Sequence, residues 1–178
     1  MDFKNFATAC TLFAFLTTVA ADVRIPNGDI PITLQSVFVL LAGLIAGANA
    51  GITSQLIYLM FGAFLPVFAG EDFGFSILAD PSVGYLFAFP LAAFITGFIG
   101  HKQNIWYILL SVILAQTSLY ISGVTVYFIN SDKTFEEVLK LGFLDLAIIG
   151  YSKAVVTGLL YFAYLQLPRN KQAVANRE

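Results

Sequence analysis

The sequence is divided into long runs that contain no charged residue. Four runs lack Asp, Glu, Lys and Arg altogether: 5–21, 30–70, 81–100 and 103–131. A fifth apolar stretch, 141–168, contains only Asp145 and Lys153. A helix that crosses about 30 Å of hydrocarbon needs roughly 20 predominantly apolar residues. Runs of this length predict an all-α integral membrane protein.

Composition excludes several classes of protein. With 58% hydrophobic and 11% charged residues, the chain is far from a soluble globular enzyme. Nine Lys and Arg against eleven Asp and Glu leave no basic patch for nucleic acid. One Cys and one His cannot together build a metal site of the usual kind. No G-x-x-x-x-G-K-[ST] motif is present, so energy from ATP has to come from a partner chain. We expect no catalytic residues, metal or cofactor.

The uncharged run 30–70 predicts two membrane crossings, because its 41 residues would form about 60 Å of helix. The turn is expected at 47–51, where Asn49 and its two flanking glycines weaken the helix. The sequence therefore predicts six spans in one membrane domain, near 3–20, 32–47, 51–65, 82–100, 104–129 and 140–167. An alternative treats the first apolar run as a secretory signal, since Lys4 precedes it and 19–21 resembles a cleavage site.

The distribution of charge favours cytoplasmic positions for both termini. In the six-span arrangement the inside segments carry five Lys and Arg and the outside segments three, in agreement with the positive-inside rule. The outside connections, 21–31, 66–81 and 130–139, are also longer than the inside ones. Long loops usually persist for function, which predicts a binding site that opens outward beneath them.

Asp145 and Lys153 are ionisable groups within an apolar stretch, and such groups usually face a cavity and bind something. Eight residues of helix place them about 80° apart and roughly 12 Å along the axis, too far for a direct pair. They would need a break at Gly150 or a ligand between them. Lys153 is expected to bind an anion such as a carboxylate. The alternative is that Lys153 extends to the membrane surface, or pairs with a carboxylate for purely structural reasons.

Uncharged polar residues within the spans predict hydrogen bonds between helices, with no ligand required. They are Thr33, Gln35, Gln55, Gln116 and Thr117. Gln35 lies near the outer end of its helix and is the strongest of them as a ligand contact. In loop 66–81, Phe68 and Phe75 suit a lid that folds over an apolar ligand.

Small residues recur four positions apart, a spacing that permits close helix contact. The pairs are Cys10/Ala14, Ala42/Ala46, Gly43/Gly47 and Ala93/Gly97. The spacing does not distinguish packing within this chain from docking of a partner. The first two pairs, on the first two spans, form the candidate docking face.

Three stretches form one pattern along the chain. They are Ile25-Pro26 followed by 31–35 and 39–43, then Leu65-Pro66-Val67-Phe68-Ala69-Gly70, then Pro81-Ser82-Val83-Gly84-Tyr85 with a helix that ends in Gly97-Phe98-Ile99-Gly100. In order and spacing these stretches resemble the BioY family, the biotin-specific substrate-binding (S) components of energy-coupling-factor (ECF) vitamin transporters. The resemblance extends over nearly the whole chain.

The resemblance implies a six-helix protein of a prokaryotic cell membrane, surrounded by lipid, that captures biotin from outside beneath its loops. It also implies partners, a transmembrane coupling subunit and two ATPases, which agrees with the missing ATP-binding motif. Two alternatives stay open. One is an S component for a different vitamin or small carboxylate, and the other is a membrane enzyme or a structural membrane subunit.

The family pattern and the polar residues together give the candidate ligand-binding residues. They are Thr33, Gln35, Phe68, Asp72, Phe75, Gly84, Tyr85, Asp145 and Lys153. Three departures from the family stand out. Its last motif resembles P-G-D-x-x-K, whereas 148–153 keeps Lys153 and has Gly150 in place of the acid; and its glycine-rich lid segment is replaced by the more acidic 70–74. The position after Tyr85 is Leu86, so a basic residue there is absent.

Overall fold

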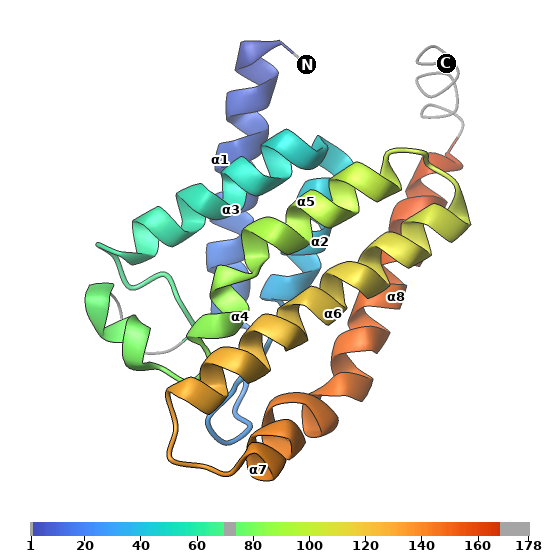
Figure 1. Cartoon of the computed structure of the whole chain (residues 1–178). Helices are drawn as coiled ribbons and strands as arrows, with labels where there is room; N and C mark the ends of the chain where they lie inside the picture. The colour runs from blue at the N-terminus through green and yellow to red at the C-terminus, as the bar shows by residue number, and fades with distance from the viewer. Residues whose placement is uncertain (1, 70–73, 168–178) are drawn as a thin grey trace.

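Helices make up most of the structure, a computed structural model that describes residues 2–69 and 74–167 (Figure 1). The elements follow in the order α1 (Phe3–Asp22), β1 (Arg24–Ile25), β2 (Ile32–Thr33), α2 (Gln35–Ala46), α3 (Ala48–Gly62), the 3-10 helix η1 (Gly74–Ala79), α4 (Val83–Phe87), α5 (Phe89–Gly100), α6 (Ile105–Ile129), α7 (Phe135–Leu139), the π-helix η2 (Lys140–Leu144) and α8 (Asp145–Leu165). In the described chain, four helical segments are long and apolar enough to cross a membrane: α1, α4 with α5, α6, and the run from α7 to α8. The expected all-α membrane architecture is confirmed at this level.

The helices pack as one bundle around α5, which lies against α2, α3 and α6. On one side α1 packs against α2 and α3, and on the other α8 packs against α6 and α2. Figure 1 shows the start of α1 and the end of α8 at one end of the bundle. The β1–β2 hairpin and α7 lie at the opposite end, which we call the hairpin end.

The turn between α2 and α3 is tighter than the expected 47–51. α2 ends at Ala46 and α3 begins at Ala48, so Asn49 lies in the first turn of α3 and not in a connection. Gly47 alone makes the turn, with φ +85° and ψ 170°. Only glycine adopts this conformation without steric cost. One residue therefore reverses the chain where the sequence suggested five.

Proline breaks the helix that was expected as one piece over 82–100. The regular α-helix is interrupted at Ala88, between α4 and α5 and two residues before Pro90, although Ala88 keeps right-handed helical dihedrals of φ −82° and ψ −10°. Pro90 has no N–H, and its ring clashes with the carbonyl of the residue four positions earlier, so the helix is interrupted there.

The last helical run begins at Phe135, five residues before the expected 140. Thr134 and Glu137 form a capping box, in which each side chain bonds the backbone N–H of the other. This arrangement satisfies two donors that every helix N-terminus otherwise leaves free. α7 then continues through η2 into α8, which is unbroken at Gly150.

Small residues meet where α2 crosses α5. A Cβ added at Gly43 would lie 2.0 Å from the backbone oxygen of Ala93, and one added at Gly97 would lie 2.3 Å from the backbone nitrogen of Ala48. The spacing motif therefore serves packing within this chain. In the candidate docking face, Cys10, Ala14 and Ala42 are buried inside the bundle and Ala46 is half-buried. The chain's own helices therefore cover three of these four residues, and docking on the first two spans stays a prediction.

Buried polar groups on neighbouring helices pair with one another, as expected for Gln55 and Thr117. Gln55 Nε2 donates to Thr17 Oγ1 at 3.3 Å, which joins α3 to α1. The hydroxyls of Thr117 and Tyr151 lie 2.9 Å apart and join α6 to α8. These two residues need no ligand.

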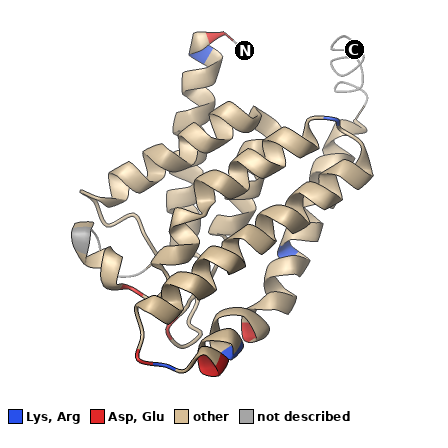
Figure 2. Cartoon of the chain, viewed as in Figure 1, with Lys and Arg blue, Asp and Glu red and all other residues tan. Residues whose placement is uncertain are grey.

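Charges are distributed unevenly between the two ends of the bundle. Figure 2 shows most of the acidic residues of the described chain at the hairpin end, around α7 and the adjoining loops. The long middle parts of the helices are almost free of charge, with one basic residue partway along α8. A band without charge between two charged ends is the pattern that a lipid bilayer selects.

Candidate ligand-binding site

A cavity opens beneath the hairpin, with an empty volume of about 740 Å³ that includes the space at its mouth. The hairpin and α2 contribute Ile30, Pro31, Ile32, Thr33, Gln35 and Ser36; the outer segments and α4–α5 contribute Phe68, Ala69, Ile77, Ser82, Tyr85, Leu86 and Phe89; α6 and α8 contribute Gln116, Leu119, Tyr120, Leu146, Ile149, Gly150 and Lys153. The lining is mainly apolar with a few convergent polar groups, the usual character of a ligand site.

Lys153 carries the only formal charge among the described residues that line the cavity. Its Nζ donates a hydrogen bond of 2.7 Å to the backbone oxygen of Thr33, where β2 ends. A backbone carbonyl satisfies one of the three donors of an ammonium group and does not neutralise its charge. The site therefore presents an uncompensated positive charge in a largely apolar space.

Gln35 is held by a short chain of hydrogen bonds along the wall of the cavity. Thr33 Oγ1 donates to Gln35 Oε1 at 3.1 Å, and Gln35 Nε2 donates to the hydroxyl of Tyr58. Tyr58 in turn packs edge-on against Phe68 with ring centroids 5.4 Å apart. These contacts fix the start of α2 beneath the hairpin.

Two tyrosines anchor the π-helical segment to the rest of the bundle. Tyr85 from α4 donates to the backbone oxygen of Gly142 in η2, and Tyr120 from α6 donates to the backbone oxygen of Leu146 at 2.8 Å. π-Helical turns are frequent at functional sites. Here the two hydroxyls hold the start of α8 against α4 and α6, and both rings line the cavity.

Neighbouring side chains fill the space beside Gly150. A Cβ at Gly150 would lie 1.9 Å from Tyr120 Oη and 2.9 Å from Gln116 Nε2. At this level the wall of the cavity is therefore built by α6. An acid at position 150, as in the motif that this segment resembles, would need the space that the ends of the Tyr120 and Gln116 side chains occupy.

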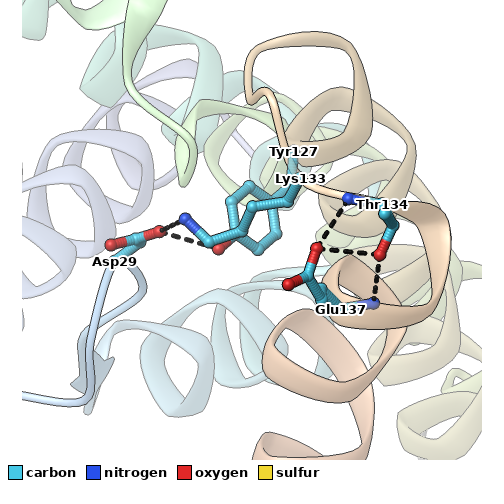
Figure 3. Close-up of polar contacts among 5 residues, drawn as sticks. All are labelled: Asp29, Tyr127, Lys133, Thr134 and Glu137. Carbon is cyan, nitrogen blue, oxygen red and sulfur yellow. Dashed lines mark hydrogen bonds and ion pairs between the residues drawn. The ribbon is translucent and has the colours of Figure 1, made fainter.

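The end of α6 and the loop after it connect the hairpin to η1. Lys133 forms an ion pair with Asp29 of the hairpin at 2.7 Å, and Tyr127 donates to the same carboxylate oxygen at 2.8 Å (Figure 3). One residue after α6, Asn130 Nδ2 donates to the backbone oxygen of Leu78 in η1 at 2.8 Å. Figure 3 also shows Thr134 and Glu137 of the capping box, which begins α7 directly after Lys133. We call the Asp29–Lys133–Tyr127 group the hairpin latch.

The hairpin latch gives a pH dependence whose sign follows from Asp29. Hydrogen bonds from Lys133 and Tyr127 hold the pKa of the Asp29 carboxyl below its usual value. A lowered pKa stabilises the closed hairpin above the ordinary value of about 3.9, and this contribution is lost as pH falls through the lowered pKa. The same ion pair raises the pKa of Lys133, so on the alkaline side the contribution is lost only as pH rises through that raised value.

We expect Asp29→Asn to lower the hydrogen-exchange protection of the hairpin amides by a factor of roughly two to five, because exposed ion pairs contribute little. Protection in the unsubstituted chain should be constant between pH 5 and 8 and fall below about pH 4. Asp132→Asn, which removes an exposed acid from the same loop as Lys133, is the matched control. Equal loss of protection in both variants would show that general charge, and not the latch, orders the hairpin.

The structure brings together most of the residues that the sequence singled out. Thr33, Gln35, Phe68, Tyr85 and Lys153 all line the cavity. Gly84 is buried against α6, where a Cβ would lie 2.6 Å from the backbone oxygen of Ser122, and it does not line the cavity. Its neighbour Tyr85 does.

Three further predicted residues are not placed in the cavity. Asp145 is exposed at the first turn of α8 and lies outside the lining, because the unbroken helix keeps it on a different side from Lys153. Asp72 lies outside the described residues. Phe75 belongs to η1, and its side chain lies outside the described part of the structure.

Sequence reasoning missed Tyr120 and gave no ligand role to Gln116. Both lie on α6, four residues apart, and therefore on one face of the helix. That spacing was available in the sequence. Gln116 was indistinguishable there from Gln55, which pairs with Thr17.

Comparisons with known proteins agree with this architecture. The BioY family model matches residues 2–169. The "Probable biotin transporter BioY" of Pyrococcus horikoshii is 35% identical over 165 residues, with 92% of this chain and 88% of that protein covered. The "Biotin transporter BioY" of Thermotoga maritima is 33% identical over 154 residues, with 84% of this chain and 89% of that protein covered.

A solved structure shares the fold. The crystal structure of the S-component for biotin from an ECF-type ABC transporter superposes with a TM-score of 0.81 at 22% identity, covering 92% of this chain and 94% of that one. The apolar helices and the transporter relatives together indicate a multi-pass membrane protein. Because the family model matches almost the whole length of the sequence, the chain belongs to the BioY family.

Proposed function

We propose that this chain is the substrate-binding component of a biotin uptake transporter, and that it holds biotin in the cavity beneath the hairpin. The observation that carries the proposal is the uncompensated ammonium of Lys153 within a mainly apolar lining. A charge in such surroundings is costly unless a partner neutralises it. A ligand that brings its own carboxylate supplies that partner.

Biotin matches the remaining chemistry of the cavity. Its carboxylate pairs with Lys153, while its valeryl chain and sulfur ring are apolar and suit the aromatic wall formed by Phe68, Tyr85 and Phe89. Its ureido head has two N–H donors and one carbonyl acceptor, which require hydrogen-bonding partners when buried. The hairpin and η1, tied together at the mouth, then close over the bound molecule.

The proposed topology has six crossings with both termini in the cytoplasm. α2 and α3 supply the second and third crossings, although at 12 and 15 residues they are shorter than the other helical segments. The acidic hairpin end then faces outward, and the few basic residues near the start of α1 and the α5–α6 connection face inward, as the positive-inside rule favours. The membrane is the cell membrane of a prokaryote.

Transport requires partners in this proposal. A ligand moves across only if the inward-facing state binds it less tightly, and the energy for that change has to come from outside the chain. A transmembrane coupling subunit and two ATPases would supply it. In this arrangement the chain captures the vitamin and performs no chemical step of its own.

Titration calorimetry on the purified chain in nanodiscs tests the proposal directly. We expect saturable binding of one biotin per chain, and weaker binding of desthiobiotin, which lacks the sulfur ring. Thiamine and riboflavin, which have no carboxylate, should not compete. If biotin fails to bind while another small carboxylate does, the chain is an S component for a different ligand and the biotin assignment is wrong.

A further inference from the structure

Gln116 differs from the other polar residues in the spans, because one of its atoms has no partner. The side chain is only 4% exposed, it lines the cavity, and its Oε1 receives no hydrogen bond from any group in the described residues. Gln35, Gln55 and Thr117 all make hydrogen bonds to neighbouring side chains. A buried acceptor without a donor is rare and calls for an explanation.

The surroundings of Gln116 fix which end of its amide is left without a partner. Its Nε2 and the hydroxyl of Tyr120 both crowd the point where a side chain at position 150 would begin. Tyr120 cannot move away easily, since it is 5% exposed, bonded to Leu146 and packed edge-on against Phe143 at 5.1 Å. The amide nitrogen is therefore turned toward α8, and Oε1, itself buried, is left without a donor in the wall of the cavity.

We infer that Gln116 is a ligand-binding residue whose Oε1 accepts a hydrogen bond from an N–H of the ureido head of bound biotin. The inference rests on the proposed function and extends it to the second polar end of the ligand. An amide oxygen accepts an N–H donor and has no favourable contact with a carboxylate. Gln116 and Lys153 thus have opposite requirements, and biotin satisfies both because it carries an N–H donor and an acid.

The neutral acceptor also compensates for the missing acid at position 150. Gly150 itself offers no side-chain oxygen, and the Tyr120 hydroxyl occupies the space beside it. Gln116 offers one from α6 without adding a negative charge near Lys153. The ammonium therefore stays free for the ligand's carboxylate.

The test combines a variant of the residue with a variant of the ligand. Gln116→Met keeps the length of the side chain and removes the acceptor. The matched ligands are biotin and its two cyclic carbamate analogues, in which one or the other ureido N–H is replaced by oxygen. We expect Gln116→Met to weaken biotin binding roughly tenfold or more and to leave the affinity for one of the carbamates nearly unchanged. The thermal stability of the ligand-free chain should not fall, because the variant removes an unpaired buried acceptor.

Each other result overturns the inference in a distinct way. Equal losses for biotin and for both carbamates would assign Gln116 a structural role. Unchanged biotin affinity in Gln116→Met would mean that water satisfies Oε1. Thr117→Val, at the next position, is the control: it should lower thermal stability without distinguishing biotin from the carbamates. Failure of the unsubstituted chain to bind biotin would refute the proposed function itself. Biotin binding by the unsubstituted chain is therefore measured before that of any variant.

Discussion

Lys153→Met is expected to weaken biotin binding by about thirtyfold or more, the largest effect of any single substitution on ligand affinity. Truncating one partner of a buried charge pair usually costs about 2–5 kcal/mol, because the other charge stays buried without compensation. In this cavity no second cation in the described lining could take over the carboxylate. Methionine keeps the apolar stem of lysine, so the packing of α8 is preserved.

A companion variant and an altered ligand separate charge from shape. Lys153→Arg should retain part of the affinity, because a guanidinium still pairs with a carboxylate but has a different geometry. Biotin methyl ester, which is uncharged, should bind weakly to the unsubstituted chain and about equally to Lys153→Met. Lys140→Met, an exposed lysine on η2, is the matched control and should leave calorimetric affinities unchanged. Undiminished biotin binding by Lys153→Met would remove the central support of the proposed function.

Lys153→Met should not destabilise the ligand-free chain, in contrast to its loss of biotin affinity. Without ligand, Lys153 makes one hydrogen bond, to the Thr33 oxygen, against the cost of a partly buried charge. Replacing such a group by an apolar one is often neutral or stabilising. We therefore expect the ligand-free Lys153→Met chain to melt at or above the temperature of the unsubstituted chain. A site that holds a partly buried, unneutralised charge is stabilised mainly when its ligand is bound.

The helical segments could be predicted from the sequence because the bilayer imposes a simple rule on composition. Runs without charge located every long helix to within a few residues. The positions of the breaks within those runs were harder to predict. Gly47 was seen within a cluster of weak helix formers, and only its φ of +85° shows that it makes the turn alone. Pro90 is evident in the sequence, but the run 82–100 is so long and apolar that it was predicted as one helix.

The site was predictable where the chemistry is exceptional and not where it is ordinary. A lysine in an apolar stretch has few uses, so Lys153 was identified directly, and it does face the cavity. Asp145 has the same rarity, yet it lies in an exposed first turn, next to η2, where a charge meets the polar end of the bundle. Its distance from the ends of the run could not be judged until α7 was known to begin at Phe135.

Gln116 shows the limit of sequence reasoning more sharply. Gln55 and Gln116 look alike in the sequence, since each lies in the middle of an apolar helix. Gln55 has a donor and acceptor opposite it on α1, whereas the buried oxygen of Gln116 has no donor opposite it among the described residues. The difference depends on which residues the fold places across from each amide, and no local pattern contains that information.

Gly43→Ala should cause the largest loss of stability of any conservative change in the bundle. The added methyl group would lie 2.0 Å from the Ala93 oxygen, 2.1 Å from Thr96 Oγ1 and 2.7 Å from the Gly97 nitrogen. Two of these atoms belong to the backbone of α5, so relief requires the two helices to separate. Helix propensity alone would favour alanine by about 1 kcal/mol. The clash reverses the sign, and overpacking of this kind costs about 3 kcal/mol or more.

Gly158→Ala is the control, since it also adds one methyl group inside a buried helix face. Its nearest neighbours are side-chain methyl groups of Ile108 and Val112 at 3.3 Å, which can shift slightly. Its melting temperature in detergent should stay close to that of the unsubstituted chain, whereas Gly43→Ala should melt roughly ten degrees lower or more. Because α2 also carries Gln35 into the cavity and α5 carries Phe89, separating these helices should lower biotin affinity as well. Saturating biotin should then recover part of the lost melting temperature, since a ligand that binds only the folded chain opposes the separation. Equal melting temperatures for the two glycine variants would show that α2 and α5 are not in close contact at this crossing.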